Sequence, residues 1–193
     1  MDPPGRKASG HSALQCHIVL HAVDPEVWRR VLVPGSATMA SLGEMLLVAM
    51  GWNNSHSHVF RVGERNIGPA FDDLDDEDHD DQTAEGDITV VEALREVGRC
   101  SLEYDFGDGW VHEVTVESLV WSPTALKFAV CLDGQNACPP DDIGGPSGFS
   151  EFLEALAEPM HDDHRSYLEW IGFPYDPKRF DLVNTNALLQ RVR

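Results

Sequence analysis

The chain has 193 residues, of which 42% are hydrophobic, and its formal net charge at pH 7 is −19. This length and hydrophobic content suit one substantial core, so the sequence predicts a single domain. Because only 14 Lys and Arg stand against 33 Asp and Glu, the composition argues against nucleic acids and anionic membranes as partners. No apolar run reaches the length of a membrane span.

The N-terminal segment and the cysteines indicate a cytoplasmic protein. Residues 1–12 lack the apolar stretch of a secretory signal and are expected to be a disordered tail, which leaves 13–193 as the domain. The cysteines show no Cys-x-x-Cys spacing, so we expect reduced packing thiols rather than zinc ligands. They are Cys16, Cys100, Cys131 and Cys138.

Two strands and a helix are predicted in the first 50 residues. Apolar residues alternate with polar ones over 14–23, and a second strand over 28–33 is close enough in sequence to pair with the first as a hairpin. Apolar residues then recur at helical spacing up to Met50, with Thr38 or Ser36 as the N-cap residue.

A further strand over 57–62 follows a turn that carries two histidines. His56 and His58 are two residues apart, which would direct both imidazoles to one side of a strand, a spacing found in metal sites. No third ligand lies nearby in sequence, so the sequence does not commit to a metal site. The elements so far predict a β-β-α-β unit that resembles a β-grasp.

An acidic block separates this unit from the rest of the chain. Ten acids and no Lys or Arg lie between Asp72 and Asp87, so 72–87 is expected to be a mobile loop. The EF-hand pattern that would indicate a calcium site is absent. Thr89 and Glu92 then form a capping-box pattern for a short helix.

A β-hairpin is predicted around a turn rich in glycine and aspartate. We expect a three-residue loop over 107–109 with Gly109 in the left-handed conformation, because a two-residue Asp108-Gly109 turn would mix apolar and acidic residues on one face. His112 would then lie opposite Tyr104 on the packed face and bond a hydroxyl or carbonyl group. That face would gather Leu102, Tyr104, Phe106, Trp110, Val114 and Val116.

The last third of the chain is predicted to be one strand, a shaped loop and helices. The strand covers 126–132, and the loop over 136–146 is too rich in Pro and Gly for regular structure. Gly144 and Gly145 could offer backbone amides to an anion. Helices are expected at 150–157, 162–171 and 181–192, covering one face or end of the sheet. Their expected buried contacts are Phe149, Leu153, Leu156, Trp170 and Leu188.

Several segments together resemble the plasmid pRiA4b ORF-3-like family, whose members are also labelled passenger TnpR-like proteins of insertion elements. The motifs are Val27-Trp28-Arg29-Arg30, Gly51-Trp52 with His56-x-His58-x-Phe60, Tyr104-Asp105-Phe106-Gly107-Asp108-Gly109-Trp110-x-His112, Pro139-Pro140-Asp141-Asp142-x-Gly144-Gly145-x-x-Gly148-Phe149, and Phe180-Asp181. The resemblance implies an α+β fold in a bacterial, plasmid- or mobile-element-associated protein, and it implies no activity. Gly43 and Ile143 depart from the family pattern, which usually has histidine and often cysteine there. Gly43 would also weaken its helix, so we expect a close contact at that glycine.

Three functions compete at this point. The first is a non-catalytic interaction module that presents Trp110, Asp105 and Asp108 to a protein or peptide partner, which the acidic charge suggests is basic. The second is a metal-assisted hydrolase that uses an Asp/His cluster. The third, a DNA-transaction accessory, comes only from the resolvase label. Neither a serine-recombinase nor a tyrosine-recombinase residue set is visible in the sequence, and duplex DNA affinity is expected to be negligible. The hydrolase candidates are Asp105, Asp108, His112, Asp141, Asp142, His56 and His58.

The sequence predicts that the hairpin turn and the loop over 139–148 lie near one another and form the principal concave site. The alternative is architectural, with the loop carboxylates buried against arginines. The candidate binding residues are Asp105, Asp108, Trp110, His112, Asp141, Asp142, Gly144, Gly145, Arg29 and Arg30.

Overall fold

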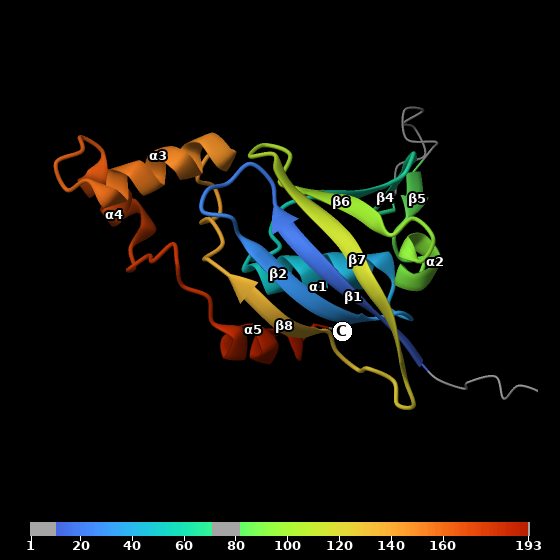
Figure 1. Cartoon of the computed structure of the whole chain (residues 1–193). Coiled ribbons are helices and arrows are strands. Elements are labelled where there is room, and N and C mark those ends of the chain that lie inside the picture. Colours follow the sequence, from blue (N-terminus) through green and yellow to red (C-terminus); the bar gives the residue numbers. More distant parts are fainter. Residues whose placement is uncertain (1–10, 71–81, 193) are drawn as a thin grey trace, which may run out of the picture.

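The computed structural model describes residues 11–70 and 82–192. An eight-stranded sheet forms the body of the molecule, in the order β5-β4-β3-β6-β7-β1-β2-β8 (Figure 1). Only β4 and β5 run parallel, so the sheet is mixed. The strands are β1 (His11–Leu20), β2 (Trp28–Pro34), β3 (His58–Val62), β4 (Arg65–Gly68), β5 (Gln82–Ala84), β6 (Arg99–Tyr104), β7 (Trp110–Ser122) and β8 (Val130–Gln135). The helices are α1 (Met39–Met50), α2 (Val90–Leu94), α3 (Gly145–Ala157), α4 (His164–Ile171) and α5 (Leu182–Leu189).

The first two strands form the predicted hairpin. Cys16 pairs with Val31, and alternate residues of β1 are buried because every second side chain points to the helix-covered face. β1 begins at His11, so residues 11 and 12 belong to the sheet and not to the tail expected over 1–12. Residues 1–10 lie outside the described part of the chain.

Helix α1 begins and ends where the sequence predicts. The Thr38 side chain accepts a hydrogen bond from the Ser41 amide at 3.1 Å, and Gly51 follows the last turn with φ 124°. The expected close contact at Gly43 is present, because a Cβ there would lie 2.9 Å from His58 Nε2. The helix therefore approaches β3 through a position that has no side chain.

The α+β class and the opening β-β-α-β order are confirmed, and the pairing adds a feature that the sequence did not reveal. The later strands join the same sheet, but β6 and β7 lie between β3 and β1 instead of only extending an edge. His58 pairs with Tyr104, and Ile18 pairs with Val114. The ends of β3 and β6 are therefore neighbours.

The acidic block is only partly described. Residues 72–81 lie outside the described part of the chain. The end of the expected loop instead forms β5, whose neighbour is β4, and the Glu85 amide donates to the Gly68 carbonyl at 2.9 Å. The backbone pairing of β5 with β4 thus overrides the preference of the acidic sequence for a loop.

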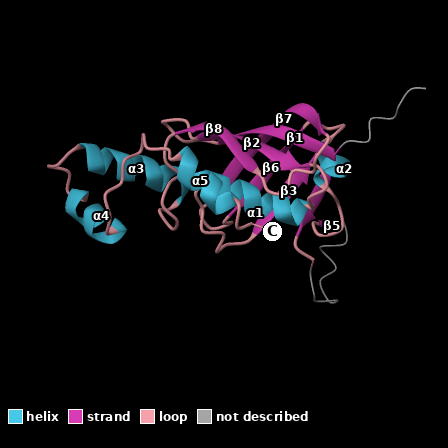
Figure 2. Ribbon diagram, turned by 90° about the horizontal axis from the view of Figure 1, so that it is seen from below, coloured by secondary structure: helices cyan, strands magenta, loops and turns pink. Residues whose placement is uncertain are grey.

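The C-terminal helices occupy two places. Helices α1 and α5 lie against one face of the sheet, whereas α3 and α4 extend beyond its edge (Figure 2). Phe152 of α3 packs on Tyr167 of α4, so these two helices bury each other. Trp170 and Leu188, expected to be buried, are 49% and 37% exposed. None of the helices in the described residues is long and apolar enough to cross a membrane.

The cysteines are packing residues, as expected. All four are free thiols, and Cys16, Cys100 and Cys131 are buried. Burial raises the pKa of Cys16 and of Cys100 to about 12, so both thiols stay protonated near neutral pH. Their contribution is hydrophobic contact within the core.

Candidate metal centre

The turn between β6 and β7 is longer than the sequence predicts. Tyr104 pairs with Trp110, so the loop spans 105–109 rather than 107–109. The apolar residues of both strands still share the buried face, because the loop is lengthened by two residues and the side-chain alternation is unchanged. Phe106 is the exception: it lies in the loop and is 57% exposed.

Asp105 organises this turn. Its backbone is left-handed, with φ 55°, and its Oδ1 accepts hydrogen bonds from the amides of Gly107 at 3.1 Å and Asp108 at 3.4 Å. An aspartate that bonds the backbone two residues on is a common way to close a turn. Gly109 is left-handed, with φ 70°, as predicted. The other carboxylate oxygen of Asp105 remains available to face its surroundings.

Asp108 joins the hairpin turn to the glycine-rich loop. Its Oδ2 accepts a hydrogen bond from the Gly144 amide at 3.1 Å, at the N-terminus of α3. The Asp108 carbonyl oxygen lies so close to Gly145 that a Cβ there would collide with it. The two loops that the sequence placed near one another are therefore in contact, and the amide offered by the Gly-Gly pair meets an internal carboxylate.

His56 enters the same region from the segment before β3. Asn54 is left-handed, with φ 57°, and the Ser55 amide donates to Asn53 Oδ1 at 2.9 Å and to the Tyr104 hydroxyl at 3.1 Å. The His56 ring lies edge-on to the Tyr104 ring, with centroids 5.7 Å apart. These contacts fix the imidazole at the end of β3, beside the β6–β7 turn.

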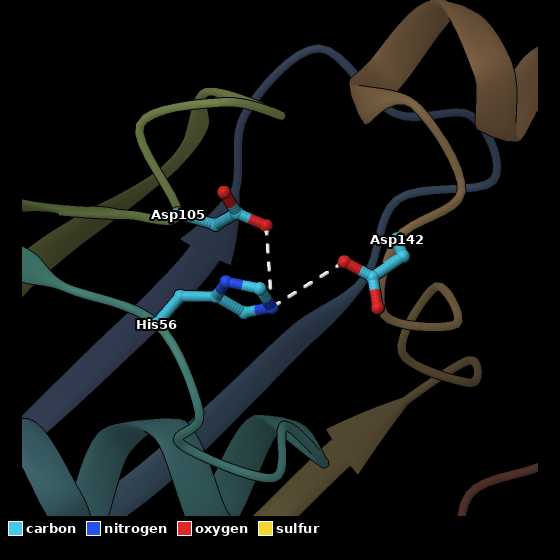
Figure 3. A group of neighbouring side chains, drawn as sticks. All are labelled: His56, Asp105 and Asp142. Carbon is cyan, nitrogen blue, oxygen red and sulfur yellow. Dashed lines mark ion pairs between the residues drawn. The ribbon is translucent and has the colours of Figure 1, made fainter.

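Three side chains from distant parts of the sequence converge at this point (Figure 3). His56 Nε2 lies 3.6 Å from Asp105 Oδ2 and 3.5 Å from Asp142 Oδ1, and the three atoms all lie within 4.8 Å of one another. The side chain of Asp142 is 73% exposed, whereas that of Asp105 is 12% exposed. Asp142, like Asp105, has a left-handed backbone, with φ 61°. Both carboxylates are thus presented by strained residues, which are common at functional sites.

The two distances from His56 Nε2 to the carboxylate oxygens suit a metal ion better than a shared proton. A charge-assisted N–H···O bond is normally about 2.7–2.9 Å long, so 3.5 and 3.6 Å are too long for a hydrogen-bonded imidazolium. A tetrahedral ion with ligand bonds of about 2.1 Å would place its ligand atoms about 3.4 Å apart. The donor set of one imidazole and two carboxylates suits Zn²⁺ and Mn²⁺.

Asp141 adds a third carboxylate beside this cluster. Burial raises the pKa of Asp141, and the nearby Asp142 and Asp105 raise it further while His56 lowers it. Its Oδ1 is buried and has no hydrogen-bond partner. Among the described residues, no Lys or Arg forms an ion pair with Asp105, Asp141 or Asp142. A cation at this point would therefore offset a local excess of negative charge.

The early arginine pair lies elsewhere, so the alternative in which it neutralises the loop carboxylates is wrong. Arg30 pairs through two bonds with Glu117, at 2.7 and 2.8 Å. The hydrogen bonds from Arg30 and Gln15 lower the pKa of Glu117 to about 2. Arg29 is only 2% exposed and forms no ion pair with a carboxylate of the described residues. All five of its N–H groups donate to backbone carbonyls, of Trp28 (2.7 Å), Ala49 (3.0 Å), Met50 (3.1 Å), Gln135 (2.8 Å) and Asn136 (2.9 Å).

His58 does not share a site with His56. Its Nε2 lies 2.9 Å from Glu85 Oε2, and the two side chains are 10% and 12% exposed. The pair joins β3 to the turn after β5, on the side of Gly43. We assign His58 a structural role.

Trp110 and His112 are fully buried, so neither can contact a partner as the sequence suggested. His112 lies opposite Leu102 and not Tyr104, and its Nδ1 donates to the Leu102 carbonyl at 3.0 Å. Its Nε2 accepts from Trp52 Nε1 at 2.8 Å. The carbonyl partner fixes a neutral tautomer, because a carbonyl can only accept. Burial lowers the pKa of His112 to about 4.

This histidine predicts a pH dependence of stability. The ordinary pKa of histidine is 6.5. Between pH 6.5 and about pH 4, His112 is therefore protonated in the unfolded chain but neutral in the folded chain. The contribution of His112 is complete above pH 6.5 and is lost as the pH falls toward 4. Between about pH 7 and about pH 4.5, this titration lowers the free energy of unfolding by roughly 2 to 3 kcal/mol. Urea unfolding should show a flatter pH profile over this range for His112→Gln than for the wild type, and equal slopes would contradict the assignment.

The residues that hold His112 and His58 in place were not among the site residues that the sequence predicts. Trp52 fixes His112 from 60 positions away, and Glu85 holds His58 from within the acidic block. The adjacent Asn53 and Asn54 were a signal that could have been used, since asparagine favours turns and tolerates the left-handed conformation.

Comparisons with known proteins agree with the fold. A model of the plasmid pRiA4b ORF-3-like proteins matches residues 12–184. The chain is 37% identical over 164 residues to the uncharacterized protein y4hQ of Sinorhizobium fredii, covering 83% of this chain and 81% of that one. The crystal structure of MM3350, a protein of unknown function from Methanosarcina mazei Go1, superposes with a TM-score of 0.81 at 25% identity, covering 90% of this chain and 97% of the other. The chain therefore belongs to the plasmid pRiA4b ORF-3-like family, a family of uncharacterised proteins.

Proposed function

We propose that this protein is a cytosolic binding module whose ligand site is built around one divalent metal ion held by His56, Asp105 and Asp142. The observation that carries the proposal is that His56 Nε2 lies 3.5 and 3.6 Å from the two carboxylate oxygens, which themselves lie within 4.8 Å of each other. The two distances from Nε2 match the edges of a tetrahedral ligand set and exceed those of direct charge-assisted hydrogen bonds. The four free thiols are consistent with a reducing compartment.

A second candidate function, metal-assisted hydrolysis, is favoured by the position of Asp141. Three protein ligands leave a fourth position for water, whose pKa a bound ion lowers. Asp141 is the neighbour of Asp142 and contributes a buried Oδ1 with no hydrogen-bond partner, which makes it the candidate proton acceptor for such a water. Asp142 is exposed, so a substrate could reach the centre from solvent.

A role in DNA transactions receives no support from the arrangement of the basic residues. The sequence holds four basic doublets, Arg6 with Lys7, Arg29 with Arg30, Lys178 with Arg179, and Arg191 with Arg193. Arg6, Lys7 and Arg193 lie outside the described residues. Arg29 is buried, Arg30 is paired with Glu117, and Asp181 lies 3.9 Å from Arg179. A phosphate-tracking surface needs several unpaired cations in a stripe.

The metal proposal predicts that purified protein stripped with chelator binds Zn²⁺ or Mn²⁺ with one-to-one stoichiometry in titration calorimetry. Replacing His56 with alanine removes the only nitrogen ligand and should weaken the affinity by about 100-fold or more. His21→Ala is the matched control, because His21 is an exposed histidine 3.5 Å from Glu113 and lies outside the cluster.

Two outcomes would contradict the metal site. One is equal Zn²⁺ affinity in the wild type and His56→Ala, which would mean that the ion binds elsewhere. The other is the absence of Zn²⁺ and Mn²⁺ binding by the stripped wild-type protein, which would mean that the three side chains do not hold an ion.

A further inference from the structure

Two hollows flank the candidate metal centre. A groove of about 790 Å³ runs between the loop over 137–141 and the segment over 170–185, and Asp141 lines it. A smaller hollow of about 420 Å³ lies between Asp142 and helix α4. Trp170 lines both. The two hollows therefore share Trp170 in their walls, and of the consecutive carboxylates Asp141 lines the larger hollow and Asp142 the smaller one.

The shared border is aromatic and exposed. Trp170 is 49% exposed and Phe173 is 59% exposed, and both line the larger groove. Helices α3 and α4 bury their common face through Phe152 and Tyr167. Trp170 also lies edge-on to Phe152, with ring centroids 6.4 Å apart, so part of its ring packs on α3 and the exposed remainder lines the hollows. Exposed aromatic side chains beside a groove are typical of binding surfaces.

The charge of the two hollows is strongly negative. Arg29 and Arg179 are the only cations that line them, every N–H of Arg29 is already bonded to a carbonyl, and Arg179 lies 3.9 Å from Asp181. The Asp105 carboxylate lies within 4.8 Å of the Asp142 carboxylate and adds to the negative electrostatic potential. The carboxylates that line the hollows are Asp141, Asp142, Asp163, Asp176 and Asp181.

We propose that the two hollows hold an extended peptide segment of a partner protein in which Lys or Arg side chains alternate with apolar residues. The segment crosses Trp170 from the groove into the smaller hollow. Carboxylates attract its cations, and the faces of Trp170 and Phe173 take the cation or the apolar neighbours. An acidic or phosphate-bearing ligand would meet repulsion from the four lining carboxylates that are not ligands of the proposed ion, Asp141, Asp163, Asp176 and Asp181. This inference rests on the binding role in the proposed function and names the partner, and the peptide would pass the proposed ion at Asp142.

The experiment begins with a random heptapeptide display library selected on the full chain in the presence of Zn²⁺. Enriched sequences are expected to contain Lys or Arg next to apolar residues. The strongest binder, made synthetically with a fluorescent label, should bind with an affinity that falls as salt rises and that is lost when its basic residues are replaced by Glu.

The site is then tested with a matched pair of variants. Trp170→Ala should weaken peptide binding by about tenfold or more, as expected of a central aromatic contact. Trp121→Ala makes the same chemical change at a tryptophan of β7 that is 57% exposed and lines neither hollow. Trp121→Ala should leave peptide affinity unchanged.

The outcomes separate this inference from the metal proposal. The library could yield acidic or uncharged sequences, or no enrichment, while Zn²⁺ binding is still lost in His56→Ala. That combination would overturn the peptide inference and support the metal site. Peptide binding that depends on Trp170 in chelator-treated protein, with no Zn²⁺ affinity, would support the peptide site and refute the ion. Equal losses in Trp170→Ala and Trp121→Ala would place the peptide elsewhere and overturn the inference.

Discussion

Replacing Arg29 with methionine is expected to lower the free energy of unfolding by roughly 3 to 5 kcal/mol. Methionine preserves most of the length of the side chain but removes the guanidinium donors from five backbone carbonyls. The bonds to Ala49, Met50 and Asn136 are buried, and Ala49 and Met50 are the last residues of α1. The positive charge at this helix end is lost as well. Denaturant unfolding measured by circular dichroism provides the test.

Arg30→Met is the matched control for this change. Arg30 is the next residue, and its side chain is 31% exposed in its pair with Glu117. Loss of a pair of this exposure should cost less than about 1 kcal/mol. Similar losses in the two variants would mean that the carbonyl contacts of Arg29 contribute little. We do not expect this result, because the surrounding residues fit the Arg29 side chain closely. Phe180 stacks on the guanidinium with a centroid distance of 4.1 Å. Position 134 is a glycine, and a Cβ there would lie only 2.7 Å from Arg29 Cδ.

The fold was predictable where the deciding interactions are local. Residues of β1 alternate because a sheet face is buried, and the Thr38 hydroxyl caps α1 because the orphan amides of a first turn need an acceptor. The order of strands was not predictable in this way. Nothing in the residues of β3 shows that β6, more than 35 positions later, will separate it from β1.

The candidate site was predictable only as two neighbouring loops. The glycine and aspartate content of both turns indicated shaped loops, and the bond between Asp108 and Gly144 explains why they meet. The length of the hairpin turn depends on the Asp105 carboxylate bonding the turn amides, which competes with the regular two- and three-residue loops. His56 joins through its contact with Tyr104, a long-range packing effect that no spacing rule contains.

Gly148→Ala should disrupt both stability and metal binding, although the residue lies in a helix. At an ordinary helical position alanine is favoured over glycine by about 1 kcal/mol. Here an added Cβ would collide with the carbonyl oxygen of Ile143, a backbone atom that cannot rotate away. The collision should push apart α3 and the loop that carries Asp142, at a cost of about 1 to 3 kcal/mol. Thermal unfolding and Zn²⁺ calorimetry on the same variant measure both effects.

The control for Gly148→Ala is Gly86→Ala, because a Cβ at Gly86 meets no atom within 4 Å. That variant should keep the stability and Zn²⁺ affinity of the wild type, whereas Gly148→Ala should bind Zn²⁺ at least about tenfold more weakly, as expected when the support of a ligand is displaced. A Gly148→Ala protein that is more stable than the wild type would show that helix propensity outweighs the contact with Ile143. A destabilised variant that keeps full Zn²⁺ affinity would show that Asp142 is not held by this loop geometry.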